Sequence, residues 1–162
     1  MKKRARRKPV RHPEHDYTGR GVYHVILCTK RRAPLMGRIE EDRYVQTPLG
    51  QFVQQQWMEL SDHFPMVRTG ACVAMPDHFH GLLSIDPQED SPLHLDDIVR
   101  RFKRYTSRQG RTLMASTHTL WQSHYWDVIV RNQLQLERTH RYILDNPARL
   151  LLKHTQRDRR HV

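Results

Sequence analysis

Two histidines separated by a single residue are the part of this sequence with the clearest chemical meaning. His78 and His80 flank Phe79 at the start of residues 79–85, whose apolar composition is typical of a strand. Side chains two positions apart on a strand point to the same face, so the two imidazoles converge while Phe79 points into the core. Neutral imidazole is a common ligand of divalent metal ions, and the pattern therefore indicates a metal pair. Because the chain contains 12 histidines, ordinary surface or core histidines are the other interpretation.

A second candidate group lies near the C-terminus, in the sequence Tyr142-Ile143-Leu144-Asp145-Asn146-Pro147. Tyr142 and Asn146 are four residues apart, so a helix presents the phenol and the amide on one face. Taken alone, this segment favours a structural interpretation. Tyr142 can be a half-buried core tyrosine, and Asn146 can cap a following helix that has Pro147 at its first position.

The elements that position these residues follow from the spacing of apolar side chains. Runs rich in β-branched and aromatic residues predict four strands, at 22–29, 67–74, 79–85 and 125–130. Apolar residues at helical spacing predict three helices, over 52–64, from Leu95 through Phe102, and from Leu134 to Asn146-Pro147. Gly37 and Pro48-Leu49-Gly50 punctuate the connection between the first strand and the first helix.

This order of elements, β-α-β-β-α-β followed by a C-terminal helix that carries Tyr142, predicts an α+β fold. It is the ferredoxin-like arrangement, an antiparallel sheet with helices packed on one face and the other face free for a ligand. The 162 residues fit one domain, which we place at 17–153, between a flexible basic arm at 1–16 and a basic C-terminal tail at 154–162. Because many unrelated activities use this scaffold, the fold alone does not identify the function.

The charge of the chain predicts a polyanionic partner. Lysine and arginine number 28 against 17 aspartates and glutamates, a net charge of +11. Nucleic acid is favoured over a membrane, because no basic amphipathic helix with a broad apolar face accompanies the basic arm. The alternative is that the basic runs are simply solvated surface.

Hydropathy and cysteine content indicate where the protein works. The mean hydropathy is -0.82, and no apolar run approaches membrane-spanning length, so no membrane contact is expected. The basic N-terminus is not followed by the apolar stretch of a signal peptide, and Cys28 and Cys72 lie in separate apolar runs without a disulfide framework. We therefore expect a cytoplasmic protein.

Together these segments resemble the single-tyrosine HUH transposases, and especially the REP-associated tyrosine transposases of bacterial chromosomes. The resemblance covers most of the chain and is carried by motifs in a fixed order, namely Asp16-Tyr17, residues 23–32, Leu49-Gly50 with Trp57, Met75-Pro76-Asp77-His78-Phe79-His80-Gly81, Phe102-Lys103, Trp121-Gln122, Ile129-Val130-Arg131-Asn132 and Tyr142-Ile143-Leu144-Asp145-Asn146-Pro147. It implies a catalytic domain in which His78 and His80 hold the metal and Tyr142 is the nucleophile. Asn146 stands where insertion-sequence relatives have a glutamine that completes the metal site, and we assign no ligand role to Asp77.

The implied reaction is cleavage and transfer of single-stranded DNA. A divalent ion held by His78 and His80 would polarise the scissile phosphate, and Tyr142 would attack it to leave a 5′-phosphotyrosine and a free 3′-hydroxyl. Mg²⁺ or Mn²⁺ is expected because the site lacks the thiolates of a closed zinc site. The resemblance further implies short palindromic hairpins, the REP-like elements, as substrate, a monomer or a homodimer as the active form, and a bacterial cytoplasm with the nucleoid as the location.

We expect the DNA contacts to come from the basic arm, from the second helix and from residues near the last strand. The predicted set is Lys2, Lys3, Arg4, Arg6, Arg7, Lys8, Arg100, Arg101, Lys103, Arg104, Trp121 and Arg131. Trp121, Tyr125 and Trp126 are candidates for stacking on bases, with burial in the core as the alternative for two of the three.

Two other functions stay open at the level of the sequence. One is a non-catalytic module that binds single-stranded nucleic acid on the same scaffold. The other is a metal-dependent nuclease that uses an activated water molecule, for which Tyr142 would be dispensable.

Overall fold

The computed structural model of the chain describes residues 15–17, 20–86, 93–114 and 119–158. Most of the predicted basic arm, including its lysines and arginines at positions 2–8, and the last four residues lie outside the described part. Within the described part, no helix combines the length and the apolar character needed to cross a membrane.

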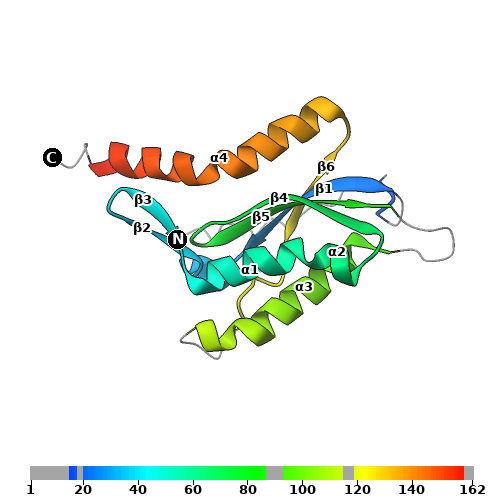
Figure 1. Cartoon of the computed structure of the whole chain (residues 1–162), viewed down its shortest axis with the longest axis horizontal. Helices are drawn as coiled ribbons and strands as arrows, with labels where there is room; N and C mark the ends of the chain where they lie inside the picture. Colours follow the sequence, from blue (N-terminus) through cyan, green and yellow to red (C-terminus); the bar gives the residue numbers. More distant parts are fainter. Residues whose placement is uncertain (1–14, 18–19, 87–92, 115–118, 159–162) are drawn as a thin grey trace, which may run out of the picture.

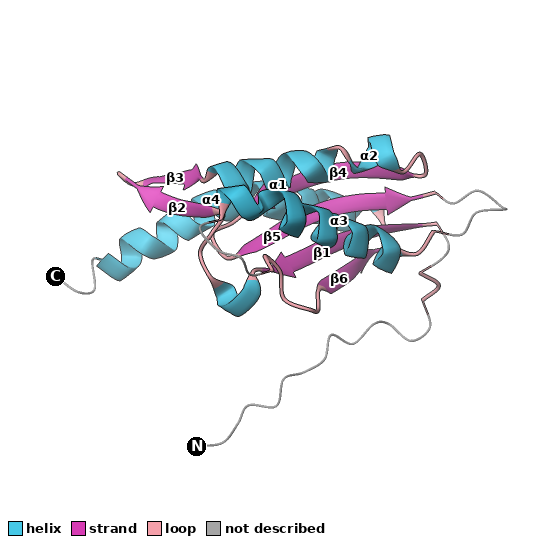
Figure 2. Cartoon of the chain, turned by 90° about the horizontal axis from the view of Figure 1, so that it is seen from below, coloured by secondary structure: helices cyan, strands magenta, loops and turns pink. Residues whose placement is uncertain are grey.

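The centre of the molecule is an antiparallel sheet of four strands in the order β4-β5-β1-β6 (Figure 2). The strands are β1 (Gly21–Cys28), β4 (Val67–Ala74), β5 (His78–Ile85) and β6 (Trp126–Val130). The two central strands, β1 and β5, are therefore the first and third in chain order within this sheet. This is the ferredoxin-like topology that the sequence predicts.

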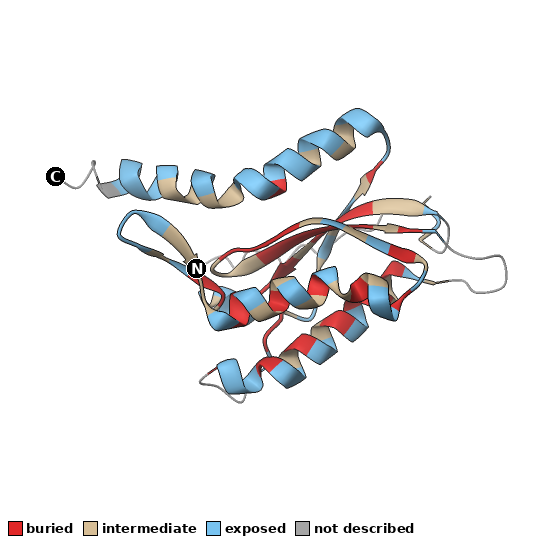
Figure 3. Ribbon diagram, viewed as in Figure 1, coloured by how far each residue is buried: buried red, intermediate tan, exposed pale blue. Residues whose placement is uncertain are grey.

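Three helices cover one face of the sheet: α1 (Pro48–Met58), the short α2 (Leu60–His63) and α3 (Leu95–Gln109). α1 begins where the Thr47 side chain accepts a hydrogen bond from the Gly50 backbone N–H, with Pro48 in the first turn. Under the helices, the Trp57 ring lies 5.2 Å from the Phe79 ring. Figure 3 shows the buried residues on the sheet and on the inner sides of α1 and α3.

Gly81 allows this close packing between α1 and the sheet. A β-carbon at that position would stand 2.4 Å from the Trp57 ring, which is too close for any side chain. The Trp57 indole N–H also donates to the Leu82 carbonyl oxygen, at 3.2 Å. Strand β5 is thus held firmly from the helix side, with its histidines on the opposite face.

The opposite face is only partly free, because the long helix α4 (Gln133–Asp158) packs across β4 and β5 (Figure 1). The prediction that this helix ends at Asn146-Pro147 is wrong, since Pro147 lies inside α4 and the predicted tail from residue 154 begins within the helix. Ile143 before the proline and Leu150 after it pack into the same apolar cluster on the sheet. Burial on both sides of Pro147 stabilises the helix against the hydrogen bond that proline removes.

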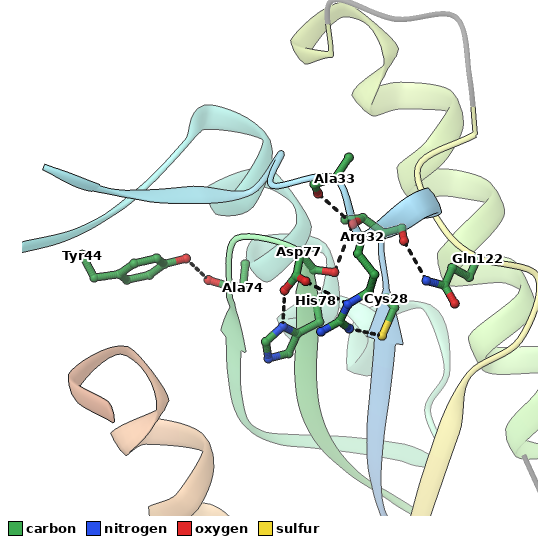
Figure 4. A network of polar contacts seen from close by, with 9 residues as sticks. Cys28, Arg32, Ala33, Tyr44, Ala74, Asp77, His78 and Gln122 are labelled. Carbon is green, nitrogen blue, oxygen red and sulfur yellow. Dashed lines mark hydrogen bonds and ion pairs between the residues drawn. The ribbon is translucent and has the colours of Figure 1, made fainter. Parts of the chain in front are cut away.

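A second sheet, absent from the prediction, is the hairpin of β2 (Gly37–Glu40) and β3 (Arg43–Gln46). Its turn residues, Glu41 and Asp42, have φ values of 46° and 57°. Two-residue turns of this kind are recognised in sequences by Asn-Gly or Asp-Gly, and Glu-Asp does not signal one. Packing explains why it forms, because the Tyr44 hydroxyl donates to the Ala74 carbonyl at the end of β4 and α4 packs against β3 (Figure 4).

Candidate active site

His78 and His80 lie on the same face of β5, as the strand period predicts. Their rings are 4.9 Å apart and almost perpendicular. Phe79 is fully buried on the other face, while His80 is only 4% exposed and His78 is half-buried. The two imidazoles are therefore held side by side at the beginning of a central strand.

His78 is oriented by its neighbour in the turn before β5. The Nδ1 atom of His78 lies 2.6 Å from Asp77 Oδ1, and the Arg32 Nε–H donates to the other carboxylate oxygen at 2.8 Å (Figure 4). A carboxylate only accepts hydrogen bonds, so Nδ1 of His78 donates in this contact, and Nε2 is the ring nitrogen that the contact leaves unused. Asp77, to which the sequence analysis assigned no ligand role, thus acts on the histidine rather than on a metal.

Arg32 reaches Asp77 from the end of β1. Residues Arg31 and Arg32 both have φ of 58°, a left-handed conformation that turns the chain sharply within the short helix η1 (Lys30–Arg32). The same turn is tied to Asp77 by the Thr29 backbone N–H, which donates to the Asp77 carbonyl at 3.0 Å. This strained turn fixes the position of the arginine beside the site.

His80 is oriented by a residue that the sequence analysis missed. The Nε2 atom of His24, on β1, lies 3.0 Å from Nδ1 of His80, and both side chains are buried. Burial lowers the pKa of His24 to about 4, and burial followed by the charges of His78, His24 and Arg32 lowers the pKa of His80 to about 3. Both rings are therefore neutral near pH 7. The sequence signal that could have identified His24 is its position as a histidine inside an otherwise apolar strand.

Helix α4 brings Tyr142 to these histidines. The Tyr142 ring lies 5.6 Å from the His80 ring and 6.2 Å from the His24 ring, and Tyr142 is 39% exposed. Ile143, the next residue, is fully buried and anchors the helix on the sheet. Tyr142 is thus a partly exposed side chain beside the histidine pair and not a core tyrosine.

The helix that carries Tyr142 is well defined at its start. The Asn132 side-chain oxygen accepts from the Gln135 backbone N–H at 2.8 Å, and Gln135 accepts in return from the Arg131 backbone N–H at 2.9 Å. Such reciprocal capping stabilises a helix N-terminus. The Asn146 side chain is bound to its own helix, because its Nδ2 donates to the Tyr142 carbonyl oxygen at 2.8 Å.

The histidine pair has the donor set of an open metal site. Nδ1 of His78 contacts Asp77 and Nδ1 of His80 contacts His24, so the Nε2 atoms are the two ring nitrogens outside these contacts. Among the residues that the structure describes, no three side chains of histidine, cysteine, aspartate or glutamate converge as a metal site. His24 is accordingly a partner of His80, and His78 and His80 are the two side chains here that could ligate a divalent ion.

Comparison with known proteins identifies the family. The family model described as "Transposase IS200 like" matches residues 18–146. This chain belongs to the IS200-like transposase family. The resemblance to REP-associated tyrosine transposases expected from the sequence is confirmed by the same comparisons.

Individual relatives of this transposase are distant. An uncharacterized Haemophilus influenzae protein is 28% identical over 159 residues, which cover 87% of this chain and 88% of the relative. A second protein of that organism, named "Putative REP-associated tyrosine transposase", is 21% identical over 142 residues, 83% of this chain and 74% of the relative. The solved structure of a REP-associated tyrosine transposase bound to a REP hairpin has a TM-score of 0.62 at 18% identity, covering 86% of this chain and 74% of that one. It shares the fold.

A basic groove lies on the helix side of the transposase, between α3 and the segment that leads to β6. Its volume is about 1090 Å³. The cations that line it are Lys30, Arg31, Arg100, Lys103, Arg104, Arg108 and Arg111. Three of the predicted DNA-binding cations, Arg100, Lys103 and Arg104, are therefore brought together with Lys30 and Arg31 from the end of β1. The sequence analysis did not place those two residues at the interface.

Two residues of the predicted set on α3 have different surroundings. The Lys103 ammonium donates to the carbonyl oxygens of Gln122 and Ser123, at 2.7 and 3.0 Å, and burial lowers its pKa. Lys103 thus holds the wall of the groove in place. Arg101 is turned away from the groove lining, and its guanidinium lies 5.4 Å from the centre of the Phe64 ring.

The prediction that Trp121 stacks on a base is corrected by its burial. Trp121 is only 4% exposed, and its indole N–H donates to the Thr106 hydroxyl at 2.8 Å. Tyr125 is half-buried and donates to Asp96 at 2.7 Å. Trp126, in contrast, is 40% exposed. Arg131 is exposed at the junction of β6 and α4.

Proposed function

We propose that this transposase is a metal-dependent endonuclease and strand transferase that cleaves single-stranded hairpin DNA through a 5′-phosphotyrosine intermediate. The observation that carries the proposal is the placement of Tyr142, from α4, 5.6 Å from His80, on β5. A phenol beside two imidazoles on one strand face puts a nucleophile and the nitrogen ligands of a cation in one place.

The metal site of the proposal uses His78 and His80, with the Asn146 amide oxygen as a third protein ligand. The Nδ2 atom of Asn146 donates to the helix backbone, and the amide oxygen is the end of that side chain that can ligate. A bound Mg²⁺ or Mn²⁺ would polarise the scissile phosphate and offset its developing charge. Asp77 and His24 keep the two imidazoles in the tautomer that ligation requires.

Tyr142 performs the transfer. Its hydroxyl oxygen attacks phosphorus, the bond from phosphorus to the 3′-oxygen breaks, and the phenolic proton is balanced by the proton gained on the released 3′-hydroxyl. The phosphodiester energy stays in the tyrosine–phosphate bond, so the reverse attack by a 3′-hydroxyl joins strands without ATP. The 39% exposure of Tyr142 leaves room for a DNA strand at this point.

The DNA is held in the proposal by basic residues outside the metal site. The groove supplies Arg100, Arg104, Arg108 and Arg111, and a chain of net charge +11 attracts phosphates generally. Further phosphate contacts are assigned to the basic arm, through Lys2, Lys3, Arg4, Arg6, Arg7 and Lys8, and to Arg131. The solved relative is bound to a REP hairpin. We therefore propose palindromic hairpins of this class as substrate, in the bacterial cytoplasm at the nucleoid, for a monomer or a homodimer.

The test is covalent capture. Wild-type protein, Tyr142→Phe and the matched control Tyr105→Phe, which alters another exposed tyrosine, are incubated with a library of single-stranded hairpins and Mn²⁺. We expect wild type and Tyr105→Phe to form a protein–DNA adduct that survives denaturation. Tyr142→Phe should bind the same hairpins and form none, since the substitution removes only the reacting oxygen.

Two other outcomes of this covalent-capture experiment would each identify a different function. Cleavage at the wild-type rate by Tyr142→Phe would mean that an activated water molecule is the nucleophile. Binding without cleavage by any of the three proteins would identify a nucleic-acid-binding module.

A further inference from the structure

Part of the sheet face that carries His80 is not covered by α4. The helix packs across β4 and β5, whereas β6 is the edge strand on the other side of β1. On β6, Trp126 is 40% exposed and Val128 is 44% exposed. Two large apolar side chains thus face solvent on an edge strand of the sheet that carries the candidate active site.

The strand register places Trp126 in line with His80. Ile26 on β1 is paired with His80 on one side and with Trp126 on the other. Residues paired across neighbouring strands share a face of the sheet. Val130 belongs to the apolar cluster that contains Ile143 of α4. Trp126 and Val128 precede Val130 by four and two positions on the same strand, so the three β6 side chains all lie on the α4 side of the sheet. Two strand spacings put the Cα atoms of Trp126 and His80 about 10 Å apart.

Trp126 differs from the other two tryptophans in its exposure to solvent. Trp57 is fully buried and Trp121 is 4% exposed, and the indole N–H of each donates to a protein oxygen. A tryptophan normally contributes its large apolar area to the core or to an interface. The exposed ring of Trp126, beside Ile26 and Val128, is therefore available to a ligand.

The residues that line the basic groove indicate the class of ligand. Its lining includes Tyr125, whose hydroxyl donates to Asp96 on α3, on the helix side of the sheet. Trp126 is the next residue, and its side chain points to the opposite face because side chains alternate along a strand. A strand of DNA that leaves the groove over the edge of β6 thus meets the Trp126 ring before it reaches His80.

We propose that Trp126 is a stacking platform for an unpaired base of single-stranded DNA, close to the phosphate that is cleaved. The inference rests on the proposed function, because it requires DNA at the histidine site. An indole stacks on the flat face of any base, so the platform positions the strand without reading its sequence.

The exposure of Trp126 makes intrinsic fluorescence the measurement. Tyr142→Phe is used as the background, so that no DNA is cleaved, and an end-labelled hairpin with single-stranded flanks is titrated while anisotropy reports binding. We expect binding to quench the tryptophan emission and to protect it from acrylamide. Trp126→Ala should abolish the quenching and weaken binding by about 5- to 140-fold, the range for one lost stack.

Two further variants keep the result interpretable. Trp126→Phe retains a stacking ring and should keep most of the affinity for DNA. This variant also tests the stacking inference if Trp126→Ala fails to fold. Tyr105→Ala removes an aromatic side chain of similar exposure, 48%, on α3, and should leave the affinity unchanged. Tight binding with unchanged emission, or equal affinity for Trp126→Ala, would overturn the stacking inference and leave the proposed function standing. Absence of any DNA binding would overturn both.

Discussion

The Nε2 atom of His24 lies 3.0 Å from the Nδ1 atom of His80, and this contact joins the two central strands of the sheet at the candidate active site. Because both rings are neutral, one must donate and the other accept. When His80 donates from Nδ1, its Nε2 lone pair is free for a cation. The ring that holds His80 in this state comes from a strand far away in the sequence.

The first prediction follows from this contact. His24→Leu removes the acceptor and should lower the affinity for Mn²⁺ by about 10- to 100-fold, as for other groups that orient a metal-binding histidine. His24→Gln places an amide oxygen in the same region and should restore part of the affinity. Manganese binding followed by electron paramagnetic resonance measures the effect without DNA. The control is His140→Ala, on the exposed side of α4; equal affinity for wild type and His24→Leu would contradict the prediction.

The second prediction concerns the other histidine. Asp77→Asn keeps the size of the side chain but removes the charge that holds His78 and Arg32. We expect the Mn²⁺ affinity to fall by about 10-fold or more, with a parallel fall in the rate of hairpin cleavage. Arg32→Ala leaves the carboxylate on His78 and should have the smaller effect. If Arg32→Ala proves the more damaging change, the arginine itself acts at the site.

The third prediction is a pH dependence of stability in the metal-free protein. Burial lowers the pKa of His24 to about 4 and that of His80 to about 3, whereas unfolded histidine titrates near about 6.5. Between these values the unfolded chain binds protons that the folded chain excludes. Stability is therefore complete above about pH 6.5 and falls as the pH is lowered, by about 1.4 kcal/mol per pH unit for each histidine.

Urea unfolding in the presence of a chelator, repeated at several pH values, measures this slope. His24→Gln removes one of the two groups and should make the slope clearly shallower. A stability that does not change between pH 6.5 and pH 4 would show that the two rings take up protons in the folded protein as readily as in the unfolded chain.

The fourth prediction compares two arginines on one helix. Arg104 lines the basic groove, whereas Arg101 lies on the Phe64 ring. Arg104→Ala should weaken DNA binding and reduce the slope of log affinity against log salt by about 0.7, the value for one phosphate contact with a single strand. Arg101→Ala removes the same charge and should change the slope less. Equal slopes for the two variants would mean that the net charge of the protein, and not the groove, determines the salt dependence of DNA binding.

Several elements were predictable because they depend on local patterns. Runs rich in β-branched and aromatic residues identified the four strands of the main sheet, and helical spacing identified α1 and α3. The β2–β3 hairpin and the true end of α4 were missed, for physical reasons. The β2–β3 hairpin turns through Glu41 and Asp42, which carry no turn signal, and α4 continues through Pro147 because Leu150 packs on the sheet beyond it. In both cases tertiary packing outweighs a local preference.

The sequence by itself determined that His78 and His80 share a face, because strand geometry places every second side chain on one side. It also determined that the chain is strongly basic and carries Tyr142 on a C-terminal helix. Only the tertiary structure decided that His24 contacts His80, that Tyr142 lies beside both rings, and that Trp126 is exposed while Trp121 is buried. These relationships depend on strand register and on how α4 crosses the sheet. Both are set by contacts between distant residues, which the periodicity of a single segment does not contain.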